Sequence, residues 1–290
     1  MGSEIILSET RLRAYRDGTF FRILSKRLRK EPEAINFANQ RGLIFFWPIK
    51  GIDFPNLWEA AAGQRPVPNN HDDPAHITWT WKDSLLAKKV WYYGKIIRQK
   101  STIISLGLLP SFYALSPNYG SPEDDYLINY EEGVLSNEEK IVYEALLANG
   151  PMDSLSLRKS ANLASRENAT RFKRALTLLQ RDFRILPIGI AEAGAWHYAF
   201  IYDTVHHHFP DLIEAAHSVS ESSARQNILE SYFLSVGSAL KSEIKSFFKW
   251  TDQQLEKALI NLVESGFLQN NIVIENKQGK AFTIKKLIDK

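Results

Sequence analysis

Apolar residues are spaced most regularly from residue 138 onwards, where their spacing predicts helices. One helical face is marked at i, i+1, i+4 and i+5 by Ile141, Val142, Ala145 and Leu146. Ser136 supplies a capping signal before this helix, and Gly150-Pro151 ends it. A short helix over residues 154–163 and a third helix over 165–183 follow. Two strand-like runs then flank the sequence AEAGA and predict a hairpin.

The same order of elements returns nearer the end of the sequence. A helix over 223–237 is followed by a short helix over 240–248, a third helix over 251–266 and a hairpin around the sequence NKQGK. The two copies align with each other, so that Gly150 matches Gly237 and KRALTLLQRD matches EKALINLVES. Such self-similarity indicates tandem domains. The order helix, short helix, helix and hairpin is typical of the winged helix, a helix-turn-helix variant.

The predicted fold class is α+β, mainly helical, with tandem winged-helix (helix-turn-helix) domains. We expect winged helices over residues 138–204 and 223–290, joined by a linker helix over 205–222. Residues 1–110 mix helical and strand-like runs, and they are predicted to form an N-terminal winged-helix-like region with insertions. Residues 111–137 contain Pro, Gly, Asn, aromatic and acidic residues, and are predicted to connect this region to the repeats.

Charge is distributed unevenly along a chain whose net charge is only +3. Residues 11–30 contain eight Lys or Arg and one Asp, residues 88–100 contain five and no acid, and residues 150–185 contain eight against three acids. Residues 101–139 contain seven acids and no base. Local basic segments on a near-neutral chain are typical of a protein that meets a polyanion with selected surfaces, although solvated helices can carry the same pattern.

Composition excludes several kinds of chemistry. The 290 residues contain no cysteine, which excludes disulfides, zinc–thiolate sites and thiol catalysis. There is no Gly-rich phosphate loop, GxSxG, HExxH or kinase motif, so nucleotide hydrolysis, serine hydrolysis and zinc proteolysis have no support. Apolar runs such as GLIFFWPI have the length of a strand, and no signal peptide is evident. We therefore expect a cytoplasmic protein with no membrane partner.

Two segments resemble a known family. Residues 224–266, ARQNILESYFLSVGSALKSEIKSFFKWTDQQLEKALINLVESG, look like the winged-helix segment of AlkZ/YcaQ-type bacterial DNA glycosylases, and LLANGPMDSLSLRKSA is similar to their middle segment. The resemblance implies tandem winged helices around a DNA-binding channel. It also implies duplex DNA as the partner and removal of alkylated or crosslinked bases without a metal.

The water-positioning motif of those enzymes is not met. They carry Gln-x-Gln or Gln-x-Asp in the N-terminal third, and the nearest local match in this chain is RGLIFFWP. Its polar positions are filled by Ile44, Phe45 and Phe46. Whether this chain acts as a DNA glycosylase therefore stays open.

The segment NNHDDPAHITWTWKD, residues 69–83, is the first place to look for a substitute. Base excision needs a carboxylate or amide that orients water beside the sugar and a pocket that holds the base. The candidate catalytic residues in this segment are Asn70, Asp72 and Asp73. Tryptophans next to them could supply the pocket.

Two other interpretations of this segment stay open. One is a metal site with the imidazole and carboxylate ligands His71, Asp72 and His76. The other is an Asx-rich turn, capped by Asn70 or Asp72, that leads into a strand with Trp79 and Trp81 on one face. Pro74 lies between the two histidines and no further ligand is predictable, which argues against the metal.

The predicted DNA contacts lie on basic or aromatic segments. The strongest candidates belong to the third helix of the first repeat, the position of a recognition helix: Arg166, Arg171, Lys173 and Arg174. The others are Arg22, Lys26, Trp79, Trp81, Lys82, Lys89 and Lys95. Trp91, Tyr92 and Tyr93 fit either base stacking or the protein core.

The sequence thus predicts a duplex-DNA-binding protein related to alkylation- and crosslink-repair glycosylases, with no cofactor and no metal. We expect a monomer, because no heptad or other dimerisation helix is visible. Two alternative functions remain. A winged-helix transcriptional regulator would need a dimer on symmetric half-sites. A non-catalytic scaffold would use the winged helices to bind protein only.

Overall fold

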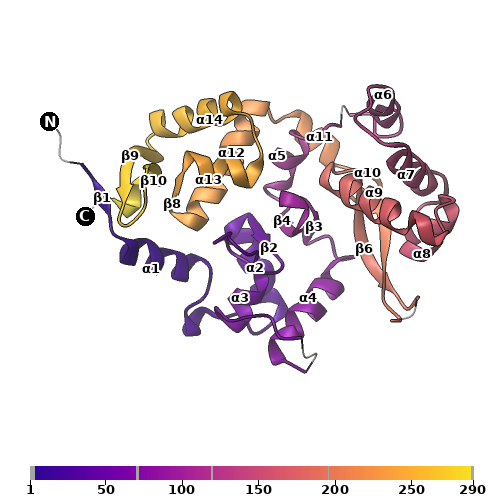
Figure 1. Cartoon of the computed structure of the whole chain (residues 1–290), viewed down its shortest axis with the longest axis horizontal. Helices are drawn as coiled ribbons and strands as arrows, with labels where there is room; N and C mark the ends of the chain where they lie inside the picture. Colours follow the sequence, from indigo (N-terminus) through magenta and orange to yellow (C-terminus); the bar gives the residue numbers. More distant parts are fainter. Residues whose placement is uncertain (1–3, 70–71, 119, 195, 289–290) are drawn as a thin grey trace.

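The computed structural model describes residues 4–69, 72–118, 120–194 and 196–288. It is a mixed α+β fold in which helices predominate, as expected (Figure 1). Within the described residues, three units share one order of elements: a helix, a strand, two helices and two strands. In each unit the last strand lies between the first and the second in the sheet.

The first unit, residues 31–105, extends from the centre to the bottom of Figure 1. It consists of α2 (Glu31–Arg41), β2 (Leu43–Phe45), α3 (Leu57–Ala62), α4 (Ile77–Leu85), β3 (Trp91–Lys95) and β4 (Ser101–Ser105). The short 3-10 turn η2 (Pro74–His76) precedes α4, and η3 (Ile97–Gln99) joins β3 to β4. Both outer strands pair antiparallel with β4.

The second unit, residues 137–204, contains the helices and the hairpin expected there. Its elements are α7 (Asn137–Asn149), β5 (Met152–Asp153), α8 (Ser154–Ser160), η4 (Arg166–Asn168), α9 (Ala169–Arg181), β6 (Ile185–Ala191) and β7 (Ala199–Thr204). A capping box between Ser136 and Glu139 begins α7, and Gly150 ends it.

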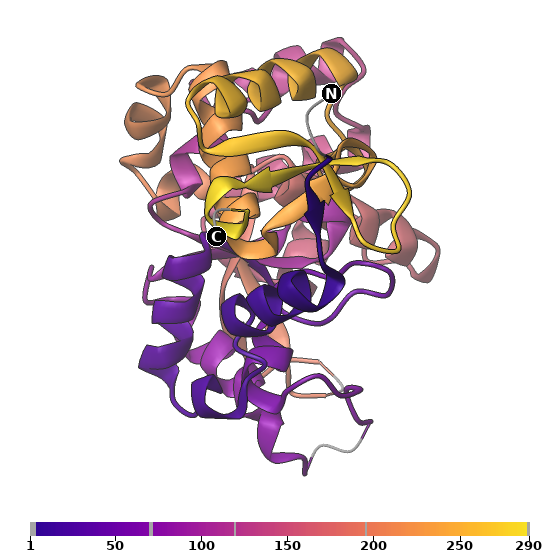
Figure 2. The same ribbon diagram turned by 90° about the vertical axis from the view of Figure 1, so that its left-hand side faces the viewer.

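The third unit, residues 221–284, repeats this order. It contains α12 (Glu221–Val236), β8 (Ser238–Leu240), α13 (Lys241–Phe248), α14 (Asp252–Glu264), β9 (Leu268–Ile274) and β10 (Lys280–Ile284), followed by η5 (Lys285–Leu287). Its sheet has an additional strand, β1 (Ile6–Leu7), which runs parallel to β9 and lies beside it in Figure 2. Ile6 and Leu7 are thereby part of the sheet of the third unit.

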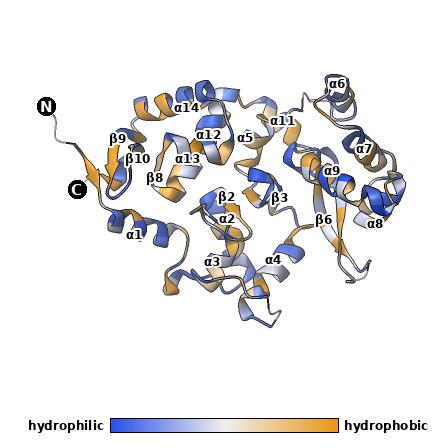
Figure 3. Ribbon diagram, viewed as in Figure 1, coloured by the Kyte–Doolittle hydropathy of each residue, from blue (hydrophilic) through white to orange (hydrophobic). Residues whose placement is uncertain are grey.

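The segments between the units are helical and packed. They are α1 (Glu9–Thr19), η1 (Leu24–Lys26), α5 (Leu109–Tyr113), α6 (Asp125–Glu131), α10 (Val205–His208) and α11 (Leu212–His217). Helix α5 contacts α11 and α12, α6 contacts α7, and α1 contacts α12. Figure 3 shows the change from the hydrophobic β1 to the largely hydrophilic α1, which explains why α1 lies at the surface.

The first and third units share one hydrophobic core. Phe45 and Phe54 of the first unit lie against Phe247 of the third, with ring centroids 5.8 and 4.7 Å apart. Phe54 also stacks on Tyr232 at 5.6 Å with an interplanar angle of 17°. Separate clusters fill the second unit and the outer part of the first. Because aromatic pairs of this kind are rigid contacts, surface residues on these two units keep fixed positions relative to one another.

Candidate nucleic-acid interface

Asp73 has a structural role in the segment around residues 69–83. Its carboxylate accepts a hydrogen bond from the backbone N–H of Ala75 at 2.9 Å and caps η2. It also forms two hydrogen bonds with the Arg65 guanidinium, at 2.6 and 2.8 Å. Arg65 is the main cause that lowers the pKa of Asp73. Asp72 is exposed, while Asn70 and His71 lie outside the described residues.

The expected strand at Trp79 and Trp81 is wrong, because both residues belong to helix α4. Tryptophans two positions apart fit the alternation of a strand, but the Asp73 cap and Pro74 start a helical run just before them. In a helix the two side chains diverge. Trp81 is buried in the core of the first unit, whereas Trp79 is half-exposed and donates its indole N–H to the Tyr198 hydroxyl at 3.2 Å.

Lys82 is enclosed, with only 1% of its surface exposed. Its Nζ lies 2.6 Å from an Asp83 carboxylate oxygen and donates to the Tyr198 hydroxyl at 2.8 Å. Five aromatic rings lie within 4.7–5.6 Å of the ammonium: Phe46, Trp79, Tyr93, Tyr198 and Phe200. Burial lowers the pKa of Lys82, with Asp83 opposing the shift. The ammonium joins the first unit to β7 and cannot reach a phosphate.

The two candidates near the start of the chain differ in accessibility. Arg22 is largely buried and pairs with Asp53 at 2.6 Å and with Glu59 at 2.7 Å. Burial opposes the charge of Arg22, but these carboxylates outweigh it and raise its pKa. Lys26 is exposed beside the Phe21 ring. Arg22 is therefore a structural cation, and only Lys26 remains available to a ligand.

Basic side chains from the first and second units meet around η3. The pKa of Lys95 is lowered by burial and by the nearby ammonium groups of Lys100 and Lys173. Turn η3, which carries the exposed Arg98, contacts both α9 and α13. We name Lys95, Arg98, Lys100 and Lys173 the central basic surface. Arg98, Lys100 and Lys173 form no ion pair with any residue that the structure describes.

The remaining basic residues of α9 and η4 extend this surface or lie beside it. Arg166 and Arg174 are exposed, and Arg171 is exposed with its guanidinium 3.5 Å from a Glu138 carboxylate oxygen. Lys89 is also exposed, but it lines an apolar hollow with His208 instead. Trp91, Tyr92 and Tyr93 are core residues and cannot stack on bases.

The turn at the centre of this surface is strained. Arg98 and Gln99 have φ angles of 52° and 57°, the left-handed region that long side chains rarely adopt. Each such residue costs about 1–2 kcal/mol relative to an ordinary conformation. Strain of this kind persists where surrounding packing fixes it, and it is often found at functional sites. In the sequence, residues 88–100 are marked only by their positive charge. No sequence feature indicates that the backbone of Arg98 has a left-handed conformation.

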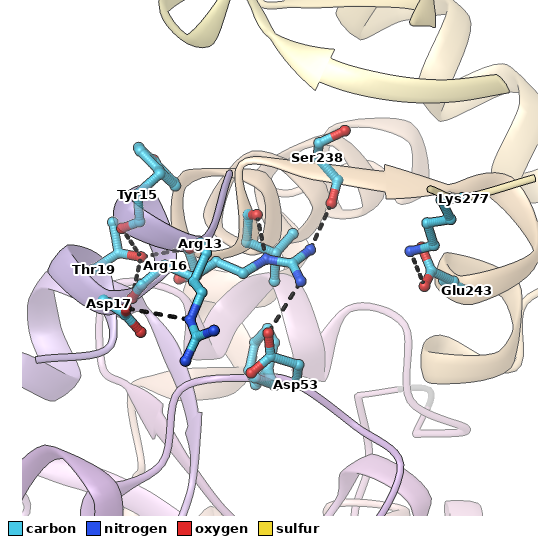
Figure 4. Close-up of polar contacts among 12 residues, drawn as sticks. Arg13, Tyr15, Arg16, Asp17, Thr19, Asp53, Ser238, Glu243 and Lys277 are labelled. Carbon is cyan, nitrogen blue, oxygen red and sulfur yellow. Dashed lines mark hydrogen bonds and ion pairs between the residues drawn. The ribbon is translucent and has the colours of Figure 1, made fainter. Parts of the chain in front are cut away.

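Two hollows lie on either side of Arg16 and Asp53, residues that no motif in the sequence marks. One, of about 370 Å³, is bordered by α1 and the β9–β10 hairpin, and the other, of about 250 Å³, by the β2–α3 loop, η3 and α13. Arg16 donates to the carbonyls of Val236 and Ser238, at 3.0 and 2.9 Å, and to Asp53 at 3.0 Å (Figure 4). The pair therefore links α1, the first unit and the third unit.

The positions that would hold the polar motif of the glycosylases contain no polar side chain. Ile44, Phe45 and Phe46 are all buried in the cores of the first unit and its junction with the third. Water cannot be oriented there. In the part of the chain that the structure describes, no three His, Asp or Glu side chains are grouped to hold a metal ion. The described helices also include none that is long and apolar enough to cross a membrane.

Comparisons with known proteins agree with this fold. The structure is similar to the Streptomyces sahachiroi DNA glycosylase AlkZ, with a TM-score of 0.55, 10% sequence identity, and coverage of 97% of this chain and 71% of that chain. At this identity the likeness concerns the fold. The family described as AlkZ related matches residues 28–249, and the chain belongs to this family. The resemblance inferred from sequence is thus confirmed. No curated protein matches the chain.

Proposed function

We propose that this protein binds duplex DNA, and that its three units are winged helices arranged to present the central basic surface. The observation that carries the proposal is the convergence of unpaired Arg and Lys side chains from two units around a strained turn. A phosphate backbone is the polyanion that such a surface fits, because each neutralised phosphate releases counterions. The similarity to a protein named as a DNA glycosylase supports the same ligand.

Helix α9 and Arg166, which precedes it, supply the main DNA contacts in this proposal. Helix α9 is the third helix of its unit, the position that enters the major groove in winged helices. Its exposed Lys173 and Arg174, with Arg166 before it, face a ligand, while Phe172 and Leu176 pack inward. Contacts from lysine position the backbone, and contacts from arginine can also reach base edges.

The test is the affinity for a short fluorescent duplex at low salt, measured by anisotropy. The double variant Lys100→Ala, Lys173→Ala is expected to bind about 10-fold more weakly, and the slope of log affinity against log salt should fall by about 1 per lost phosphate contact. Lys140→Ala is the matched control, because Lys140 lies on α7 and pairs with Glu144 at 2.8 Å. A wild-type protein that binds no duplex at low salt would refute the proposal.

The same experiment separates the alternative functions. A transcriptional regulator would bind one sequence far more tightly than others and form a dimer in ultracentrifugation. A scaffold would bind no DNA. A DNA affinity that stays unchanged when Arg171 and Arg174 are reversed to glutamate would favour the scaffold or move the DNA surface elsewhere. Base excision needs a polar group at the sugar, and that group must lie outside residues 44–46.

A further inference from the structure

An apolar hollow of about 310 Å³ lies where the first unit meets the helices that follow the second unit. Its residues come from the turn before β3, from the segment after β4, from α5, and from α10, α11 and the loop between them. Helices α5 and α11 lie side by side in Figure 1. Leu106, Leu109, Phe209 and Leu212 give the hollow apolar walls. A hollow of this size and composition is typical of a small-molecule site, in which a few polar groups select the ligand.

Three polar side chains line the same hollow: Lys89, His208 and Asp211. The imidazole of His208 is buried, with 6% of the residue exposed, and its Nε2 has no hydrogen-bond partner among the described residues. Burial, together with the nearby Lys89 ammonium, lowers the pKa of His208 to about 4. The imidazole is therefore neutral near pH 7, and among the described residues of the lining only Lys89 and Asp211 carry a charge.

Lys89 and Asp211 are both exposed, and neither forms an ion pair with any residue that the structure describes. Asp211 occupies the N-cap position of α11, yet its carboxylate accepts no capping hydrogen bond from the described backbone. Lys89 has a φ of 51°, a left-handed conformation that costs about 1–2 kcal/mol and is often found at functional sites. The edge of the apolar hollow thus carries one unpaired cation and one unpaired carboxylate.

This hollow differs in chemistry from the central basic surface. Lys89 precedes β3 and Lys95 ends it, so the two lysines are separated by roughly 15–20 Å of extended chain. A phosphate backbone would be repelled by Asp211 and would gain nothing from apolar walls. A neutral apolar molecule would leave both charges without a partner. The ligand that matches all of these features has one negative and one positive group beside an apolar body.

From this arrangement we propose that the hollow binds a free α-amino acid with a large apolar side chain. The carboxylate of the ligand pairs with Lys89, its ammonium pairs with Asp211, and its side chain lies against Leu109 and Phe209. Both ion pairs form at the edge of an apolar surface, and hydrogen bonds between charged groups are stronger than those between neutral groups. A ligand of this size is expected to have a dissociation constant on the order of 0.1–1 mM. This binding is independent of the proposed binding of duplex DNA.

Three related molecules separate the contacts when their binding to the full chain is measured by ligand-observed NMR. L-Phenylalanine has both charged groups, 3-phenylpropanoate lacks the ammonium, and 2-phenylethylamine lacks the carboxylate. L-Phenylalanine is expected to bind about 10-fold more tightly than either of the other two, because each of them leaves one charge of the hollow without a partner.

Two variants assign the contacts. Lys89→Met should weaken L-phenylalanine about 10-fold and leave 2-phenylethylamine unchanged, whereas Asp211→Asn should weaken L-phenylalanine similarly and leave 3-phenylpropanoate unchanged. Lys88→Met is the matched control for the lysine, because Lys88 is exposed but pairs with Glu31 at 2.8 Å and lies outside the lining. Glu214→Gln is the control for the carboxylate, since Glu214 is exposed on α11 and also lies outside the lining. Both controls should keep the wild-type affinities.

A third variant fills the hollow without changing a charge. Ala215 is exposed on α11 and lines the hollow, so Ala215→Trp should abolish binding with the melting temperature unchanged. The inference is overturned if wild type binds no L-phenylalanine up to about 10 mM, if the three molecules bind equally, or if Ala215→Trp keeps the wild-type affinity. Duplex affinity of Lys89→Met should stay within about 2-fold of wild type. A larger loss would assign Lys89 to the DNA interface instead, so the two proposals fail separately.

Discussion

Lys82 is a buried residue, although a lysine is usually exposed. A lysine in a segment with two tryptophans suggests phosphate and base contacts. In the structure its ammonium is instead enclosed by five rings, the Tyr198 hydroxyl and Asp83. The rings provide a negative electrostatic surface that offsets the lost hydration of the charge. Sequence gives no warning of this, because three of the rings come from residues far from Lys82 in the chain.

Removal of Lys82 should destabilise the protein without affecting its ligand. Lys82→Ala leaves a void and removes the cation that pairs with Asp83, so the free energy of unfolding should fall by about 3 kcal/mol. Lys82→Met removes the same cation but fills the void, so it should cost less than Lys82→Ala, about 2 kcal/mol. Urea denaturation measures both values. A DNA affinity that drops in folded Lys82→Met would instead assign Lys82 to the interface.

Lys95 should make duplex binding sensitive to alkaline pH. Its pKa is lowered by burial and by Lys100 and Lys173, so it loses its proton at a lower pH than an ordinary lysine. A bound phosphate favours the charged form, and affinity should therefore fall as the pH rises through this lowered pKa. Anisotropy titrations between about pH 7 and pH 10 should show this fall in wild type. Lys95→Arg, which stays charged, should flatten the profile, and parallel profiles would contradict the assignment.

Helices with clear caps and periodicity could be predicted from the sequence. Helix α7 begins after Ser136 and ends at Gly150, as the sequence predicts. Helix α14 likewise begins after the predicted cap Thr251. The failure at residues 77–85 has a physical origin, since a nine-residue helix with tryptophans two apart satisfies a strand pattern equally well. Strand β1 has only two residues, and its partner lies at the other end of the chain, so no local pattern marks it.

Gly42 lies where helices α2 and α12 approach each other closely. It ends α2 with a φ of 71°, and an added Cβ would lie 2.3 Å from the Ser231 hydroxyl oxygen on α12. Gly51 shares a positive φ of 78° but has open space around it. Gly51→Ala should therefore cost about 1 kcal/mol from backbone strain alone, and Gly42→Ala about 2 kcal/mol or more. Equal losses in thermal unfolding would show that α12 does not constrain this glycine.

At the scale of the whole molecule, the candidate site could not be predicted. Arg16, Asp53, Arg98 and Ser246 come from α1, two loops of the first unit and a helix of the third. They converge because the first and third units share a core built around Phe54 and Phe247. Composition and repeats indicate the units, but the angle between units depends on packing that no local pattern encodes.

The parallel pairing of β1 with β9 has a consequence for biosynthesis. Ile6 and Leu7 are translated long before Val273 and Ile274, their partners in the sheet. The hydrogen bonds from Arg16 likewise cannot form until Val236 and Ser238 have been translated. Folding in order of translation can complete the second unit early, but the N-terminal segment must stay undocked until the third unit emerges. Closure of such a long loop is slow, so the nascent chain exposes the surface around Asp53 until the third unit has emerged and folded.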